Sequence, residues 1–214
     1  MGRANRKGQS MTYIAQDGRT ALFELNPKKN DFVTVCHLTL KKGQSLNLIY
    51  LYTLKKLESL SFEKHFKERD ERLLSYGFTK HGIKNIDTIH DLLSQEFMKI
   101  DNSHPENAYT ISVAISEIML SYDKIDGIIY PSLRSPLDYN IVLKNKSADR
   151  ALRVKRCDFM EITKNVNREI FIRHLFTTSR INKQKNELIW STNIEDGLGW
   201  LTEDTLSLVE FTQD

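Results

Sequence analysis

Residues 2–27 of this 214-residue chain have the sequence GRANRKGQSMTYIAQDGRTALFELNP, and the rest of the chain is best understood from this stretch. It contains Arg3, Tyr13 and Glu24 in that order. A guanidinium group can bind a diphosphate through paired hydrogen bonds, a tyrosine ring can stack on a flat heterocycle, and a carboxylate can stabilise a developing cation. These groups suit the binding of a dinucleotide and the cleavage of its glycosidic bond. Spacing alone leaves an alternative open, in which a surface arginine, a half-buried tyrosine and a solvated glutamate share no site.

The same stretch predicts a strand followed by a short helix. Residues 11–15 predict a strand that carries Tyr13. An Asp-Gly pair then predicts a turn, and Thr20 is expected to cap a helix that Pro27 ends. Glu24 would therefore lie on the last turn of this helix or at a bend, beside apolar neighbours that bury it in part. The alternative for this side chain is an exposed helix glutamate.

A second informative stretch, IDGIIYPSLRSPLDYNIVL, covers residues 125–143. It predicts a glycine-led buried strand over residues 127–130, a loop with two prolines over residues 131–138, and another strand over residues 139–143. Ser132 lies in this loop and Asn140 at the start of the second strand. The segments GRAN, TYIA and TALFELNP, together with this second stretch in the same order, resemble the RES-domain family, which is named after its Arg, Glu and Ser. Without the resemblance, Ser132 fits a proline-rich turn equally well, and Asn140 fits ordinary hydrogen bonding at a strand end.

The resemblance implies a fold of the α+β class. It would be similar to the ADP-ribosyltransferases of the diphtheria-toxin type, with a split mixed or antiparallel β-sheet as the core and helices on its flanks. We expect a RES-like domain over residues 1–164 that lacks the strand which precedes the arginine in the family. Residues 165–214 are expected to form a C-terminal extension packed on the same domain.

The resemblance also implies an activity on NAD, which would be the substrate, with no further cofactor. Arg3, Tyr13 and Glu24 are the expected catalytic residues, and Arg3 and Tyr13 would also bind NAD together with Ser132 and Asn140. We expect Arg3, Tyr13, Glu24 and Ser132 to converge on one cleft. Family members cleave the nicotinamide–ribose bond by phosphorolysis or hydrolysis. The alternatives are a protein ADP-ribosyltransferase and a catalytically degenerate module that only binds a partner.

Many RES proteins are toxins of toxin–antitoxin pairs, so the resemblance implies an Xre-like antitoxin as a partner, and it leaves a homo-oligomer open. The formal net charge is only +3 and no long stretch is dominated by one sign, which argues against direct nucleic-acid binding. No apolar run approaches the length of about 18 residues that a membrane span requires. The chain also starts without the pattern of a signal peptide. We therefore expect a soluble, cytoplasmic protein.

Several other kinds of site lack their sequence signatures. The six histidines show no HxxxH or HxH spacing, and no CxxC pair occurs, so no metal site is expected. The GxSxG elbow, the phosphate-binding GxxxxGK[ST] loop and the GxGxxG fingerprint are absent. His37 is expected to be a half-buried strand residue, and Cys36 and Cys157 are expected to be small core residues.

The remaining elements follow from hydrophobic periodicity. Alternating segments predict strands, and apolar residues at helical spacing among charged ones predict amphipathic helices. Gly77 and Gly82 are expected to close the first long helical segment. The predicted strands cover residues 31–40, 46–51, 139–143, 152–163, 170–181 and 187–193, and the predicted helical segments cover residues 53–76, 87–100 and 109–122, with a helical turn near 147–152.

Overall fold

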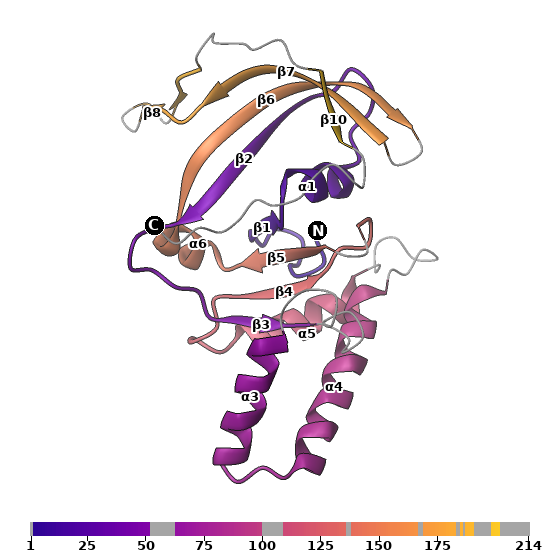
Figure 1. Cartoon of the computed structure of the whole chain (residues 1–214), viewed down its shortest axis with the longest axis vertical. Helices are drawn as coiled ribbons and strands as arrows, with labels where there is room; N and C mark the ends of the chain where they lie inside the picture. Colours follow the sequence, from indigo (N-terminus) through magenta and orange to yellow (C-terminus); the bar gives the residue numbers. More distant parts are fainter. Residues whose placement is uncertain are drawn as a thin grey trace. The chain divides into compact units, whose positions relative to one another are not determined.

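The computed structural model describes residues 2–51, 63–99, 109–135, 138–166, 169–182, 185, 187–190 and 198–201 (Figure 1). The chain divides into two compact units, and each unit combines two separate segments. The first unit contains Met1–Ile14 and Leu46–Ser147, and the second contains Ala15–Ser45 and Ala148–Asp214. One sheet mixes parallel and antiparallel strands, another is antiparallel throughout, and helices accompany both. The predicted α+β class is confirmed.

The mixed sheet has the strand order β1-β5-β4-β3. Strand β4 pairs with β3 in parallel and with β5 antiparallel. All five residues of β4 are buried, as its nearly continuous apolar sequence predicts. The bounds of these strands agree with the predicted segments within one or two residues. The strands are β1 (Thr12–Ala15), β3 (Leu48–Tyr50), β4 (Gly127–Pro131) and β5 (Tyr139–Leu143).

Close contacts constrain Gly127, the first residue of β4, and Asp126, which directly precedes it. A Cβ atom added to Gly127 would lie 2.3 Å from the carbonyl oxygen of Val142, so β5 can approach β4 only because this residue is glycine. The neighbouring Asp126 is buried, and its carboxylate accepts hydrogen bonds from the Asn47 N–H at 2.8 Å and the Ser147 hydroxyl at 2.7 Å. These contacts fix the chain before β3 and after β5 against the same carboxylate.

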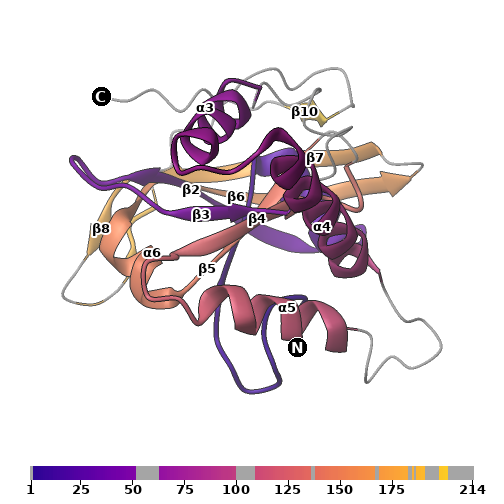
Figure 2. The same cartoon turned by 90° about the horizontal axis from the view of Figure 1, so that it is seen from below.

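Three helices of the first unit are α3 (Glu63–Ser75), α4 (Lys80–Met98) and α5 (Thr110–Leu120), and the first two form a helical hairpin (Figure 1). Helix α4 contacts α5, which in turn contacts β4 (Figure 2). The start of the helix predicted over residues 53–76 lies outside the described residues. The apolar core of the unit joins the sheet, the helices and the N-terminal loop through Ala4, Leu51, Phe97, Ile115, Ile128, Tyr130 and Val142.

Helix α4 begins earlier than the periodicity predicts. The hydroxyl of Thr79 accepts a hydrogen bond from the N–H of Gly82 at 3.0 Å and so caps the helix. The prediction that Gly82 closes a helix is therefore wrong, because this glycine lies in the first turn of α4. Gly77 does follow the end of α3, with a φ of +88° that suits glycine. No helix among the described residues has the length and apolar character that crossing a membrane would demand.

The second unit contains the antiparallel sheet, with the strand order β10-β7-β6-β2. Helix α1 (Gly18–Leu25) packs on it by burying Leu22 and Phe23 among apolar residues of the sheet. Val33, Met160, Ile162 and Ile170 supply that apolar surface. The strands are β2 (Phe32–Leu40), β6 (Leu152–Val166), β7 (Glu169–Thr178) and β10 (Leu198–Leu201), with a short pair formed by β8 (Ile181–Asn182) and β9 (Glu187–Leu188), and the chain enters β6 from α6 (Asn145–Ala151).

Two details of the second unit differ from the sequence predictions. Helix α1 is capped by Asp17, whose carboxylate accepts a hydrogen bond from the N–H of Thr20 at 2.7 Å, so Thr20 is not the cap. The strand predicted to reach residue 181 ends at Thr178, and the short antiparallel pair of β8 and β9 follows it. The predicted division after residue 164 stays a prediction. Strand β6 continues across that position, and β7 of the expected extension pairs with it.

Candidate functional site

Arg3 is held by the C-terminal end of α4. Its Nη1 atom donates a hydrogen bond to the carbonyl oxygen of Phe97 at 2.6 Å, and its guanidinium carbon lies 5.3 Å from the centre of the Tyr109 ring. The last carbonyl groups of a helix have no partner within the helix and carry partial negative charge, so a cation is favoured there. The side chain expected to bind phosphate is therefore held in a defined position.

The hydroxyl of Tyr13 connects β1 with the N-terminal loop. It accepts a hydrogen bond from the N–H of Ala4 at 2.9 Å and donates one to Oδ1 of Asn5 at 2.6 Å. Burial raises the pKa of Tyr13, although the Ala4 N–H and the charge of Arg3 act in the opposite direction. The phenol therefore stays protonated at neutral pH and can donate a hydrogen bond. Tyr13 as a whole is 43% exposed, which leaves surface for a ligand.

Asn5 holds the N-terminal loop together, and the sequence analysis missed it. Its amide nitrogen donates to the carbonyl oxygens of Gln9 at 2.7 Å and Arg6 at 3.2 Å, and its Oδ1 also accepts from the N–H of Gly2 at 3.1 Å. An asparagine in a polar, glycine-containing segment often bonds nearby backbone in this way, which is the signal that could have identified it. Asn5 thus fixes the loop that brings Arg3 and Tyr13 together.

Ser132 directly follows β4 and is buried. Its hydroxyl oxygen accepts hydrogen bonds from the N–H groups of Arg134 at 3.2 Å and Ser135 at 2.9 Å, and its own N–H donates to the carbonyl oxygen of Asp138 at 2.9 Å. The hydroxyl of Ser135 donates to the carboxylate of Asp138 within the same loop. Ser132 therefore fixes Arg134, Ser135 and Asp138 among the described residues that follow β4, and its contact with a ligand stays a prediction.

Asn140 is a buried residue of β5, directly opposite Tyr130 of β4. The centres of the Tyr130 and Phe97 rings lie 5.1 Å apart, and Phe97 is the residue whose carbonyl oxygen holds Arg3. Strand β5 also lies between β4 and β1, the strand that carries Tyr13. The structure thus puts four predicted site residues on neighbouring parts of the first unit: Arg3, Tyr13, Ser132 and Asn140.

Glu24 belongs to the second unit. It lies in the last turn of α1, as predicted, and is partly buried beside Leu22 and Phe23. The helix ends at Asn26, which has a left-handed φ of 49° and donates its N–H to the carbonyl oxygen of Leu22 at 2.8 Å. The expectation that Glu24 shares one cleft with the residues of the first unit stays a prediction.

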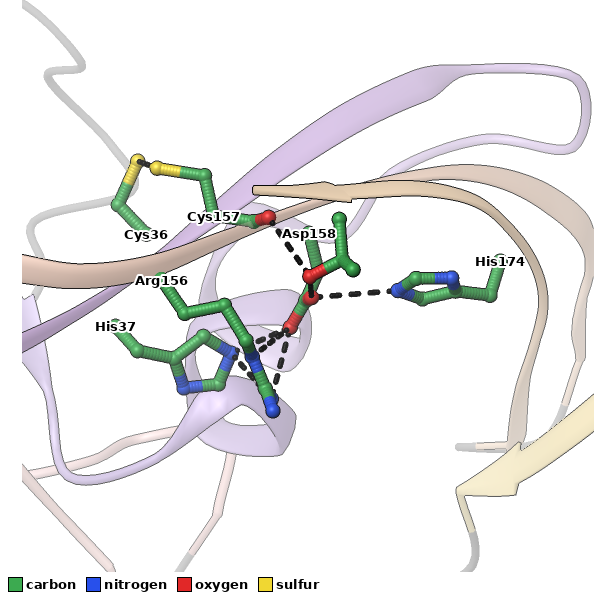
Figure 3. A network of polar contacts seen from close by, with 7 residues as sticks. Cys36, His37, Arg156, Cys157, Asp158 and His174 are labelled. Atoms are coloured by element: carbon green, nitrogen blue, oxygen red, sulfur yellow. Dashed lines mark hydrogen bonds and ion pairs between the residues drawn. The ribbon is translucent and has the colours of Figure 1, made fainter. Parts of the chain in front are cut away.

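A polar network on the antiparallel sheet was not predicted at all (Figure 3). The buried Asp158 uses Oδ2 to contact Nε2 of His37 at 2.8 Å and Nε of Arg156 at 3.0 Å. Its Oδ1 accepts a hydrogen bond from the hydroxyl of Thr177 at 2.7 Å and lies 3.3 Å from Nε2 of His174. Strand register brings these residues together, and a single sequence does not specify register.

Burial acts to raise the pKa of Asp158, but its partners outweigh this effect. The hydrogen bond from Thr177, the charge of Arg156, the hydrogen bond from His174 and the charge of His37 together hold the pKa below its ordinary value. His37 is half-buried, as predicted. Within the parts of the chain that the structure describes, no group of three or more His, Cys, Asp and Glu side chains is arranged to hold a metal ion.

The cysteines differ in exposure. Cys157 is buried, as predicted, but Cys36 is exposed, and the prediction that it is a core residue is wrong. Its apolar neighbours alternate with it along β2, so they occupy the opposite face of the sheet.

Comparison with models of protein families matches residues 1–163 to the RES domain. Comparison with curated proteins and with solved structures finds no significant match.

Proposed function

As the chain belongs to the RES-domain family, we propose that it consumes NAD by cleaving the bond between nicotinamide and ribose, through phosphorolysis or hydrolysis. The family match carries this proposal, because it spans residues 1–163 and includes every predicted site residue. The arrangement of Arg3 and Tyr13 gives it structural support. The N-terminal loop carries Arg3 and bonds the hydroxyl of Tyr13, and the Phe97 carbonyl holds the guanidinium group of Arg3. Each of the two side chains offers a group that suits part of a dinucleotide.

The leaving group explains why few protein groups are needed. Nicotinamide is bound to ribose as a positively charged pyridinium and departs as a neutral molecule, so no acid has to protonate it. An ordinary glycosidase, in contrast, uses a pair of carboxyl groups, one of which protonates the leaving group. We assign the single required carboxylate to Glu24, which would stabilise the cationic ribosyl group in the transition state.

Substrate binding would depend on the first unit. A guanidinium carries five N–H donors, and the Phe97 carbonyl uses one of those on Arg3, so others can bind the diphosphate. The half-exposed ring of Tyr13 would stack on nicotinamide or lie against its ribose. We assign Ser132 and Asn140 to further hydrogen bonds with NAD, since both are polar residues at the loop end of neighbouring strands.

The direct test is incubation of the purified protein with NAD, with and without inorganic phosphate, followed by identification of the products. Free nicotinamide with ADP-ribose would indicate hydrolysis, and free nicotinamide with phosphorylated ADP-ribose would indicate phosphorolysis. Either result supports the proposal. Transfer of ADP-ribose from labelled NAD to a protein would instead identify an ADP-ribosyltransferase. If NAD stays intact under both conditions, the chain is a binding module and the proposal is wrong.

We also propose that the protein acts as a cytoplasmic toxin and that an Xre-like antitoxin inhibits it. The family membership supports this partner. Co-expression with the product of an adjacent gene for a small helix-turn-helix protein should give a stable complex with reduced NAD consumption. A co-expressed protein of this kind that leaves NAD consumption unchanged would contradict the proposed partner.

A further inference from the structure

The two cysteines of the chain face each other across β2 and β6 (Figure 3). Cys36 and Cys157 are direct partners in the antiparallel register, although they are 121 positions apart in the sequence. The thiol of Cys157 donates to the sulfur of Cys36, with 3.2 Å between the two Sγ atoms. The sulfurs are thus already in contact while both thiols are free.

The backbone geometry suits a covalent bond between them. Directly opposed residues in an antiparallel pair have Cα atoms about 4.5 to 5.5 Å apart, within the range of about 4.4 to 6.8 Å that a disulfide spans. The residues that follow the cysteines, His37 and Asp158, contact each other on the opposite face of the sheet. That contact holds the two strands in register next to the sulfurs, so a bond would require only a small movement of the side chains.

The different exposure of the two thiols gives them different roles. Cys36 is exposed and can meet a reagent from solution, whereas Cys157 is only 1% exposed and has the sulfur of Cys36 beside it. Burial, followed by the hydrogen bond and the charge of Cys36 and by the charge of Asp158, raises the pKa of Cys157 to about 12. The buried thiol is therefore protonated and unreactive toward reagents in solution.

We propose that Cys36 and Cys157 form a thiol modification site that reacts with low-molecular-weight disulfides and closes an intrachain disulfide between β2 and β6. In the first step the Cys36 thiolate attacks the small disulfide, which gives a mixed disulfide on Cys36 and releases one small thiol. In the second step the Cys157 sulfur attacks the Cys36 sulfur, the bond between Cys36 and the small group breaks, and the proton of Cys157 ends on the second small thiol as it leaves. Two protein thiols are oxidised and one small disulfide is reduced to two thiols.

Neither cysteine is among the residues assigned to NAD. The cross-link between them would join the two strands that contribute Val33, Met160 and Ile162 to the surface on which α1 packs. A disulfide that closes so long a loop restricts the unfolded chain, so the oxidised protein should unfold at a higher temperature than the reduced protein.

The test is treatment of the full-length, reduced protein with oxidised glutathione, followed by intact mass measurement and titration of free thiols. We expect the parent protein to lose both thiols and the mass of two hydrogen atoms, with no glutathione retained at the end and complete reversal by dithiothreitol. We expect Cys157→Ser to retain one glutathione on Cys36. Because Cys36 is exposed, Cys36→Ser should fold normally, and its thiol at Cys157 should stay unmodified.

Three results would overturn the proposal. The parent protein could keep glutathione on Cys36 without closing the bond, or it could form disulfide-linked dimers on a non-reducing gel. The third result is that Cys157 in the folded Cys36→Ser variant reacts with oxidised glutathione as quickly as Cys36 does in the Cys157→Ser variant. Since the parent protein supplies the first two results, the proposal can be tested even if serine at the buried position prevents folding, and Cys157→Ala then provides the second variant.

Discussion

At the scale of single residues, the N-terminal loop shows how a polar side chain can serve both folding and binding. The hydroxyl of Tyr13 accepts a hydrogen bond from the N–H of Ala4, a residue that is only 2% exposed. Tyr13 itself remains partly accessible to solvent. The sequence could suggest Arg3 and Tyr13 as site residues because their chemistry depends on side-chain type. It could not reveal that the carbonyl of Phe97 holds Arg3, because every residue type carries that backbone group.

Tyr13→Phe tests the structural part of this account. The substitution keeps the ring but leaves the buried Ala4 N–H without its acceptor, so the free energy of unfolding should fall by about 1 kcal/mol. Urea denaturation would measure the change. Tyr76→Phe is the matched control because Tyr76 is 77% exposed, and its stability should equal that of the parent protein. Equal stability of all three proteins would show that the Tyr13 hydroxyl does not hold the loop.

At the scale of helices and strands, local patterns predicted which segments are regular, but several boundaries and all pairings required the structure. The predicted strand at residues 139–143 agrees with β5 in its bounds, because alternation and flanking turn residues mark both ends. Helix α4 starts earlier than its apolar pattern predicts because the side chain of Thr79 caps it. A contact of the same kind makes Asp17, and not Thr20, the cap of α1. The predictions thus missed contacts between side chains and the backbone.

Gly127→Ala tests the close approach of β4 and β5. The added Cβ would lie 2.3 Å from the backbone oxygen of Val142. Because this oxygen belongs to the backbone, no rotation of a side chain can relieve the clash. We expect the free energy of unfolding to fall by about 2 kcal/mol or more, as overpacking typically causes. Gly82→Ala is the control, because its Cβ would have its nearest neighbour at 3.5 Å, and alanine favours the helix. Thermal denaturation would measure the stability of both variants. Equal melting temperatures of Gly127→Ala and Gly82→Ala would contradict the predicted clash between β4 and β5.

The network around Asp158 should make stability depend on pH. Because its pKa is lowered in the folded protein, the ionised carboxylate stabilises the fold above the unfolded-state pKa of about 3.9, and this contribution is lost as the pH falls through the folded-state value. Asp158→Asn removes the charge and should lower the free energy of unfolding by about 2 kcal/mol at pH 7. The difference from the parent protein should shrink toward pH 3.

Urea denaturation at pH 7 and pH 3 would measure both effects of Asp158→Asn. Asp149→Asn is the control, since Asp149 is an exposed residue of α6, and it should match the parent protein at both pH values. A difference between Asp158→Asn and the parent protein that stays constant or grows toward low pH would contradict the predicted role of the carboxylate.

At the scale of the whole molecule, each unit is assembled from segments far apart in the sequence. The chain passes from β1 to α1 within a few residues, yet β1 joins the mixed sheet and α1 packs on the antiparallel one. Sequence proximity therefore suggested one continuous domain, whereas strand pairing between distant segments determines the two units. The same limit applies to the candidate site, because residue types identify Glu24, Arg3 and Tyr13 as candidates without giving the distances between them.

The central claim, that Glu24 supplies the carboxylate for cleavage of NAD, is tested most directly by steady-state NAD consumption of Glu24→Gln. Glutamine keeps the shape but removes the charge, so turnover should fall by about two to three orders of magnitude with little change in the NAD concentration required. Arg3→Ala should instead raise that concentration, because a phosphate contact is made in both the ground state and the transition state. Glu71→Gln, at an exposed position of α3, should match the parent protein. Equal turnover by Glu24→Gln and the parent protein would contradict the account.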